Sequence, residues 1–292
     1  MDKNIDPKVF AIVLNYNGQD CLVPCLDSLY QSDYANLEIV VVDNASKDGS
    51  LENAREKFPK IHFIKNSENV GFACGNNVAI RFALEKMADY VFLLNNDATV
   101  QIDTISNLVK EAEENPDLGM ASPIILSADG NGVWFAGGKI SWREMKTVHV
   151  PGSQEQNPYE TEYVSGCAAL IRKDVFGEIG LFDENFFLYY EDADLSCRAT
   201  RAGFKLRMIP EALAHHAEKS EMVNKKKLYW LVLSGLIFFK KNSRGFNRIW
   251  SVFYLFLRKT KNRLNMLTST SDKDVMIRKA FHDYKIFLRQ NL

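Results

Sequence analysis

The sequence predicts an α/β fold with a doubly wound, mostly parallel sheet, followed by a basic helical extension. Three observations indicate this fold. Short aliphatic and β-branched runs end in polar, turn-forming residues, segments with helical spacing separate these runs, and basic residues concentrate near the C-terminus. Such apolar runs are typical of parallel strands that are covered on both faces. Ligands of these sheets bind beyond the carboxyl ends of the strands.

Strand and helix patterns alternate at least three times in the first 120 residues. We expect strands at 9–18, 37–46 and 89–98, and helices at 20–31, 50–58, 74–88 and 102–115. From about residue 120 the alternation gives way to loops and hairpin-like strands that are rich in glycine and aromatic residues. A strand then follows at 166–172, with helices at 174–179 and 193–202 and extended chain after residue 203.

The charge of the chain is unevenly distributed. Residues 223–292 hold 16 of the 36 Lys and Arg residues but only three of the 37 Asp and Glu residues, which gives this segment +13 and leaves −14 for residues 1–222. We therefore expect a main domain over 1–222 and a basic, aromatic tail over 223–292. Such a tail is attracted to polyanionic surfaces, and no nucleic-acid motif is present to favour nucleic acid as its partner.

The tail contains two apolar runs flanked by Lys and Arg, within 225–241 and 248–259. They are twelve and nine residues long, and a membrane span needs about 20 apolar residues, so neither crosses a bilayer. Both fit helices that lie in the interface of an anionic membrane. The alternative is two helices that pack on the body of the protein or on a second subunit as a homodimer.

The start of the chain is acidic and polar and lacks the pattern of a signal peptide, so we expect a cytoplasmic protein. The five cysteines then correspond to reduced thiols, and Cys21 and Cys25 to packing residues. The chain contains no G-x-G-x-x-G, P-loop, G-x-S-x-G, H-E-x-x-H or C-x-x-C motif. Ordinary dinucleotide, P-loop, hydrolase, zincin and thioredoxin functions therefore lose their main support.

Polar residues follow each of the first three expected strands. These are Asn15-Tyr16-Asn17, Asp43-Asn44 and Asn95-Asn96-Asp97. Turn and cap residues would explain any one of them, but their matched positions favour a site at the edge of the sheet.

Five stretches, in this order, carry a family resemblance: "VVDNASKDGS", "NVGFACGNN", "LLNNDATV", "YYEDADLSCR" and "HHAEKS". Over about residues 8–240 the chain resembles the inverting family 2 glycosyltransferases of the GT-A fold, and most of all bacterial rhamnosyltransferase-like enzymes. The resemblance implies a catalytic domain over 1–222 that binds a dTDP- or UDP-sugar, most of all dTDP-rhamnose, and a glycan or lipid-linked acceptor. Because the Q-x-x-R-W motif of processive synthases is absent, it also implies transfer of a single sugar.

The resemblance assigns the donor side of the site. Asp97 would bind Mn²⁺ or Mg²⁺ at the diphosphate, although Asn95 stands where the family motif begins with Asp, and His215 with Ser220 would match the family's H-x-x-x-x-S stretch. Asp43 would read the base, or form an Asx turn with Ser46. The other expected nucleotide-binding residues are Asn15, Tyr16, Asn17, Asn69, Gly71, Asn77 and Asn96.

The resemblance also assigns the acceptor side. In Glu191-Asp192 the second acid would be the general base, although acids at a helix start are also favoured by the helix dipole. The dipole lowers the pKa of such an acid and burial raises it, and the sequence leaves the balance open. Gly166, Cys167 and Trp134 are expected near the acceptor and sugar, with core packing as the alternative. The rival functions are a sugar nucleotidyltransferase and a non-catalytic module that binds nucleotide sugars.

Overall fold

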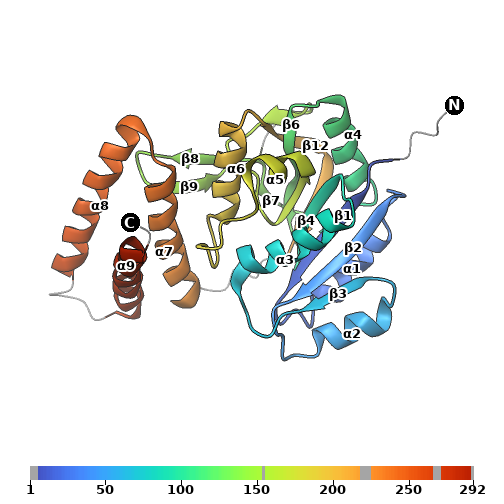
Figure 1. Ribbon diagram of the computed structural model, residues 1–292, viewed down its shortest axis with the longest axis horizontal. Coiled ribbons are helices and arrows are strands. Elements are labelled where there is room, and N and C mark those ends of the chain that lie inside the picture. The colour runs from blue at the N-terminus through green and yellow to red at the C-terminus, as the bar shows by residue number, and fades with distance from the viewer. Residues whose placement is uncertain (1–5, 153–154, 218–224, 266–270, 291–292) are drawn as a thin grey trace.

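The computed structural model describes residues 6–152, 155–217, 225–265 and 271–290. Ser220 of the H-x-x-x-x-S stretch lies outside the described residues. One large mixed sheet forms the centre of the molecule, helices cover both of its faces, and three C-terminal helices stand beyond one of these helical layers (Figure 1). The α/β fold with a mostly parallel sheet is therefore confirmed.

The main sheet has the strand order β10-β12-β6-β11-β4-β1-β2-β3. Its strands are β1 (Val9–Asn15), β2 (Leu37–Asp43), β3 (His62–Lys65), β4 (Tyr90–Asn95), β6 (Leu118–Ser127), β10 (Tyr159–Glu160), β11 (Ala168–Arg172) and β12 (Lys205–His216). The pairs β1–β2, β1–β4, β2–β3 and β6–β12 are parallel, whereas β11 is antiparallel to β4 and β6. Two short strands, β5 (Ala98–Val100) and β7 (Val133–Phe135), pair with β12 and β6.

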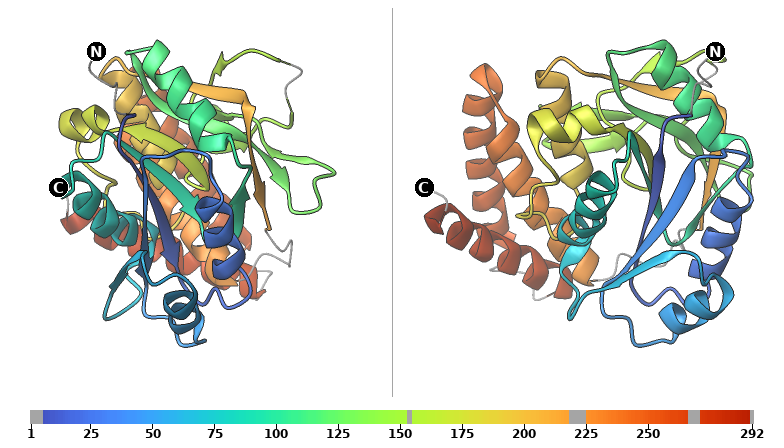
Figure 2. Two further views of the ribbon diagram at one scale, coloured as in Figure 1. Left: turned by 90° about the vertical axis from the view of Figure 1, so that its right-hand side faces the viewer. Right: turned by 45° about the vertical axis from the view of Figure 1, so that its right-hand side comes forward.

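The apolar runs became central strands because both of their faces are covered. Residues 9–13 of β1 and 40–42 of β2 are fully buried. Helices α1 (Leu22–Tyr30), α2 (Ser50–Lys57) and α4 (Thr104–Glu114) lie on one side of the sheet. Helices α3 (Gly71–Glu85), α5 (Lys173–Ile179) and α6 (Glu191–Arg201) lie on the other side (Figure 2). The apolar stripe of each helix faces this shared core.

The predicted elements are confirmed to within a few residues, apart from α3, which begins at Gly71 and not at residue 74. The structure adds β3, β6 and the hairpin of β8 (Gly138–Ser141) and β9 (Lys146–His149), which was expected only as loops and hairpin-like strands. Strand β6 accommodates Pro123 where the β6–β12 register shifts, a position that tolerates a residue without an N–H.

The tail forms α7 (Lys225–Asn242), α8 (Gly245–Asn265) and α9 (Asp272–Gln290). In α7 the apolar run is buried, with Leu236, Ile237, Phe238 and Phe239 at most 3% exposed. Trp142 stacks on Phe238 at a ring-centroid distance of 6.2 Å. The expectation that this first run lies at a membrane surface is therefore wrong: α7 packs between α6 and α9, which was the alternative for this helix.

A buried polar network fixes the C-terminal end of α7 to α6. Asp194, which is 2% exposed, accepts hydrogen bonds from Arg198 Nε at 2.8 Å and from Asn242 Nδ2 at 2.7 Å. Arg201 donates to the side-chain and backbone oxygens of Asn242 at 2.8 and 2.6 Å. Because α6 begins with Glu191-Asp192, this network also fixes the helix that carries the expected catalytic acids.

We predict that Asp194→Ala lowers the free energy of unfolding by about 3 kcal/mol, because it removes the shared acceptor from a buried charged network. Urea denaturation followed by circular dichroism measures the change. Glu178→Ala is the matched control, since Glu178 is an exposed residue of α5, and its effect is expected to stay within about 0.5 kcal/mol. Equal effects of the two substitutions would contradict a stabilising role for the network.

Candidate active site

The register of the sheet places the predicted site residues at one edge. Asn15 at the end of β1 pairs with Asp43 at the end of β2, and Leu14 pairs with Asn95 at the end of β4. Strand β11 runs in the opposite direction, so Gly166 and Cys167 reach the same edge, where the Cys167 carbonyl accepts a hydrogen bond from the Asn95 amide at 2.9 Å. Strand β12 brings its C-terminal histidines to this edge through its pairing with β5.

Asn15 joins the ends of three neighbouring segments. Its side chain is fully buried, and its Nδ2 lies 2.9 Å from Asp43 Oδ1 and 2.9 Å from Ser50 Oγ. Its Oδ1 accepts a hydrogen bond from Asn96 Nδ2 at 2.9 Å. A Cβ atom at Gly18 would lie 2.4 Å from both Asn15 Oδ1 and Asn96 Nδ2, so only glycine leaves room for this link. Asn15 therefore positions the surrounding loops from within.

Asp43 differs from the expectation that it reads the nucleotide base. The residue is fully buried. One carboxylate oxygen accepts the Asn15 amide and the other accepts the backbone N–H of Ser46 at 3.0 Å. This is the Asx turn that was the alternative, and it leaves no exposed carboxylate surface for a base. Tyr16, 51% exposed, and Asn17, exposed at a left-handed φ of 52°, line the open side of the same loop.

The loop before α3 is fixed by short-range hydrogen bonds. Asn69 Oδ1 accepts the Gly71 amide at 2.9 Å. Gly71 has a φ of +86°, and a Cβ there would lie 2.5 Å from the Phe187 carbonyl oxygen. Glycine is therefore required both by the backbone conformation and by the close approach of the loop before α6.

Asn77 was expected to bind nucleotide, but its contacts are different. It is 1% exposed, its Nδ2 donates to the Phe182 carbonyl at 2.9 Å, and its Oδ1 accepts the Phe182 amide at 3.0 Å. Both the Nδ2 and the Oδ1 of the Asn77 side chain are therefore bonded to the 182–184 loop. Asn77 therefore holds this loop against α3 and does not face the site.

Asp97 lies beside His216, and not beside His215 as expected. His216 Nε2 lies 3.1 Å from Asp97 Oδ1, and His216 is 6% exposed. Successive side chains of a strand point to opposite sides, so the ring of His215 is directed away from the side on which His216 meets Asp97. The expected histidine is therefore wrong by one residue. In the pairing of β12 with β5, His215 lies opposite Thr99, and His216 lies opposite Ala98, the residue after Asp97.

The pKa of Asp97 is lowered. Burial alone would raise it, but the hydrogen bond and charge of His216, with the charge of Lys227 on α7, favour the ionised form more strongly. Trp134 packs on His216 at a centroid distance of 4.4 Å and on His149 at 4.8 Å. Trp134 therefore packs against the histidine that contacts Asp97.

Asp97 and His216 fit a divalent cation whose remaining ligands come from a bound substrate. Across the described ranges, no group of three or more His, Cys, Asp or Glu side chains gathers to hold an ion. Asp97 and His216 therefore supply two ligands at most. A third of the Asp97 side chain is exposed, and His216 Nδ1 is a buried polar atom without a hydrogen-bond partner. Mg²⁺ sites at nucleotides typically combine one or two protein ligands with phosphate oxygens and water.

Glu191 and Asp192 open α6 directly after a strained backbone. Tyr189 and Tyr190 both have φ of 69°, in the left-handed region that non-glycine residues seldom adopt. This turn directs the first residues of α6 toward the strand edge, where Asp192 Oδ2 accepts the Gly166 amide at 3.1 Å. A Cβ at Gly166 would lie 3.1 Å from the Phe72 ring and 3.6 Å from the Asp192 Cβ. The small residue at 166 therefore permits this contact.

Burial outweighs the helix dipole at the acid pair. It raises the pKa of Asp192, against hydrogen bonds from the Gly166 and Ala193 amides and the charge of His149. Burial, and then the charge of Asp192, raise the pKa of Glu191 well above its usual range. Glu191 Oε2 is buried without a hydrogen-bond partner. The two amides stabilise charge on Asp192, and Glu191 Oε2 has no such partner, so Asp192 is the more readily ionised member of the pair.

Three residues of the site escaped the sequence analysis. His149 of β9 lowers the pKa of Asp192, and Lys227 of α7 lowers the pKa of Asp97. Neither residue stands in a recognisable motif. His216 stands next to the expected His215, and only the pairing of β12 with β5 shows which of the two rings meets Asp97.

The family of the chain follows from comparison with known proteins. Residues 10–180 match the model of glycosyl transferase family 2. The N-acetylglucosaminyl-diphospho-decaprenol L-rhamnosyltransferase of Mycobacterium tuberculosis strain H37Rv is 27% identical over 241 residues, which cover 72% of this chain and 76% of that protein. The dTDP-rhamnosyl transferase RfbF of Shigella flexneri is 24% identical over 214 residues, 73% of this chain and 70% of that one.

Two solved glycosyltransferase structures share the fold. The mannosyltransferase PcManGT from Pyrobaculum calidifontis, in complex with GDP-Man and Mn²⁺, has a TM-score of 0.62 at 17% identity and covers 97% of this chain and 84% of its own. GalNAc-T7 with UDP, GalNAc and Mn²⁺ has a TM-score of 0.66 at 18% identity, and the match spans 80% of this chain but 48% of that one. The family match over more than half of the chain and the shared GT-A fold identify the protein as a glycosyltransferase of family 2, similar to bacterial rhamnosyltransferases.

Proposed function

We propose that this enzyme transfers one rhamnose from dTDP-rhamnose to a hydroxyl group of a glycan or lipid-linked acceptor, with inversion at the anomeric carbon. The observation that carries the proposal is a pair of carboxylates with opposite pKa shifts at one edge of the sheet, lowered at Asp97 and raised at Asp192. Opposite shifts at one site divide the roles of two acids. The names of the two relatives, which include a dTDP-rhamnosyl transferase and a diphospho-decaprenol rhamnosyltransferase, support this donor and acceptor.

Asp97 and His216 are the residues that would hold Mn²⁺ or Mg²⁺ at the donor diphosphate. Such an ion, when bound, offsets the negative charge that develops on the departing diphosphate. Tyr16 and Asn17 would lie against the base and ribose. Because Asp43 is closed by its Asx turn, we assign no base discrimination to it, and a UDP-sugar is the alternative donor.

Asp192 is the proposed general base. It would take the proton of the acceptor hydroxyl while the oxygen attacks the anomeric carbon and the bond from that carbon to the diphosphate oxygen breaks. Attack from the face opposite the leaving group inverts the configuration. A raised pKa makes Asp192 a stronger base than an exposed aspartate, and the higher rise at Glu191 favours negative charge on Asp192, the residue that reacts.

We predict that Asp192→Asn lowers the transfer rate by about 100-fold or more and leaves affinity for dTDP nearly unchanged. Transfer and donor hydrolysis are measured with dTDP-rhamnose and several UDP-sugars, with and without Mn²⁺. In the unchanged enzyme the rate falls as pH drops through the raised pKa of Asp192, so the loss begins above its ordinary value of 3.8. Glu191→Gln is the control, since it keeps residue 191 neutral. Undiminished turnover of Asp192→Asn would refute the assignment of the base.

We predict that His216→Ala weakens Mn²⁺ binding in the presence of dTDP by about tenfold, because the imidazole beside Asp97 is removed. Electron paramagnetic resonance of free Mn²⁺ measures this affinity without any dependence on turnover. His215→Ala is the matched control on the neighbouring residue of β12 and is expected to leave the affinity unchanged. The opposite pattern would restore His215 as the ligand.

We further propose that α8 attaches the enzyme to the inner face of the plasma membrane. Within the described segments, no helix combines the length and hydropathy needed to cross a bilayer. The exposed apolar residues of α8 are Phe246, Ile249, Val252, Phe253, Phe256 and Leu257, from 47% to 77% exposed. Exposed Arg244, Arg248 and Lys259 accompany them. An apolar face with adjoining cations fits an anionic lipid surface. A second copy of the chain is the alternative partner for this face.

We predict that the double substitution Phe253→Asp and Phe256→Asp weakens binding to phosphatidylglycerol vesicles by at least about tenfold, because two phenyl groups no longer enter the lipid. Cosedimentation at low and high salt measures binding, and vesicles of phosphatidylcholine give the uncharged comparison. Val275→Asp, at a 41% exposed position of α9, is the control. A dimer that this double substitution separates, without any vesicle binding by the unchanged protein, would favour the second copy.

A further inference from the structure

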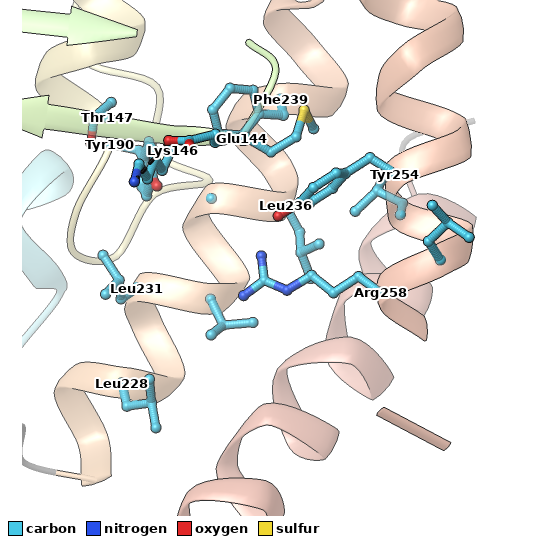
Figure 3. A pocket seen from close by; sticks show the side chains of 15 residues that line it. Glu144, Lys146, Thr147, Tyr190, Leu228, Leu231, Leu236, Phe239, Tyr254 and Arg258 are labelled. Atoms are coloured by element: carbon cyan, nitrogen blue, oxygen red, sulfur yellow. Dashed lines mark ion pairs between the residues drawn. The ribbon is translucent and has the colours of Figure 1, made fainter. Parts of the chain in front are cut away.

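A cavity of about 760 Å³ lies between α7, α8 and the β8–β9 hairpin (Figure 3). Its apolar wall consists of Leu228, Leu231, Val232 and Leu236 of α7 with Leu255 and Leu257 of α8. The volume is within the range of about 300–1,000 Å³ that is usual for ligand sites. None of the residues assigned above to the donor, the ion or the acid pair lines it.

One end of the cavity is polar and carries one cation without a carboxylate partner. Glu144 and Lys146 form an ion pair with each other at 2.8 Å. Arg258 extends from α8 into the cavity toward α7, and within the described part of the chain it forms no ion pair (Figure 3). Arg258 and Tyr190 both line the cavity, and the charge of Arg258 lowers the pKa of Tyr190, which burial raises.

This polar end adjoins the proposed general base. Tyr190 lines the cavity and is the residue directly before Glu191-Asp192. A Cβ at Gly235 of α7 would lie 3.2 Å from the Tyr190 ring, so the absence of a side chain there lets the ring lie against α7. The wall that Tyr190 forms therefore belongs to the same turn that positions Asp192.

We propose that the cavity binds the lipid part of a lipid diphosphate acceptor, with the apolar chain along the leucine wall and the diphosphate beside Arg258. This inference rests on the proposed function and names its acceptor class. A free glycan would leave the leucine wall without a partner, whereas a neutral lipid would leave Arg258 without one. Helix α8 forms one wall of the cavity, and its outer face is apolar and exposed. If this outer face lies on the membrane as proposed, the apolar chain of the acceptor can enter the cavity from the bilayer.

The test is the binding of farnesyl diphosphate to the full chain, by calorimetry, without vesicles and with EDTA present so that the probe does not bind an ion at the donor site. We expect saturable binding that Arg258→Ala weakens by about tenfold or more, the value of one charge-assisted contact. Leu231→Glu, at a 43% exposed position of the leucine wall, is expected to weaken it similarly. The controls are Arg289→Ala and Val275→Glu, at exposed positions of α9 outside the cavity.

Two further probes separate the sources of the signal. Inorganic diphosphate alone and farnesol alone are each expected to bind more weakly than farnesyl diphosphate, since each satisfies one end of the cavity. Equal displacement of farnesyl diphosphate by short-chain phosphatidylglycerol would overturn the proposal in favour of general lipid contact. The proposal is also overturned if the Arg258→Ala variant binds farnesyl diphosphate as tightly as the unchanged protein does.

Failure of this inference is distinguishable from failure of the proposed function. Hydrolysis of dTDP-rhamnose in the presence of Mn²⁺ needs no lipid. If hydrolysis occurs and farnesyl diphosphate does not bind, the cavity is not the acceptor site while the glycosyltransferase proposal stands. If the probe binds as expected and no nucleotide sugar is hydrolysed or transferred, the lipid site stands and the donor proposal fails.

Discussion

The arrangement of the site depends on the buried side chain of Asn15. Its amide links the end of β1 to Asp43 at the end of β2 and to Asn96 after β4. The Asn15 side chain is fully buried, so a lost partner would leave a buried polar group unpaired at a cost of about 1–3 kcal/mol. The loop of Tyr16 and the turn that carries Asp97 are thus fixed relative to each other before any ligand binds. A preorganised edge of this kind loses little entropy when a charged donor arrives.

The same edge holds two carboxylates in contrasting surroundings. Asp97 has a histidine neighbour and the nearby charge of Lys227, which lower its pKa and favour its ionised form. Asp192 lies beside a buried acid and inside the loop of Gly166, so burial favours its neutral form. The first environment suits a permanent anion that attracts a cation, and the second suits a group that gains and loses a proton. Residue type alone does not distinguish these roles, because both residues are aspartates at the start of a turn or helix.

Much of the fold was predictable because its signals are local. The apolar runs of β1, β2 and β4 and the periodicity of the helices between them can be recognised without tertiary information, and the polar residues after each strand correctly indicated the edge. What was not predictable depends on pairing between distant segments. The choice of His216 over His215 depends on the β5–β12 register. The closure of Asp43 depends on Asn15, 28 residues away, and the use of Asn77 depends on a loop more than 100 residues later.

The tail shows why composition was an incomplete guide. The apolar runs of α7 and α8 are similar in composition, yet the run of α7 is mostly buried and that of α8 is mostly exposed. Contacts of α7 with the loop before α6 explain the difference. Trp230 stacks on Phe187 at 4.3 Å, Ser234 donates to the Leu188 carbonyl at 2.7 Å, and Tyr190 lies against Gly235. Because this loop directs Asp192 toward the strand edge, α7 is part of the catalytic domain in physical terms. The boundary expected at residue 222 therefore divides the charge of the chain but not its packing, because α7 packs on α6 on one side and on α9 on the other.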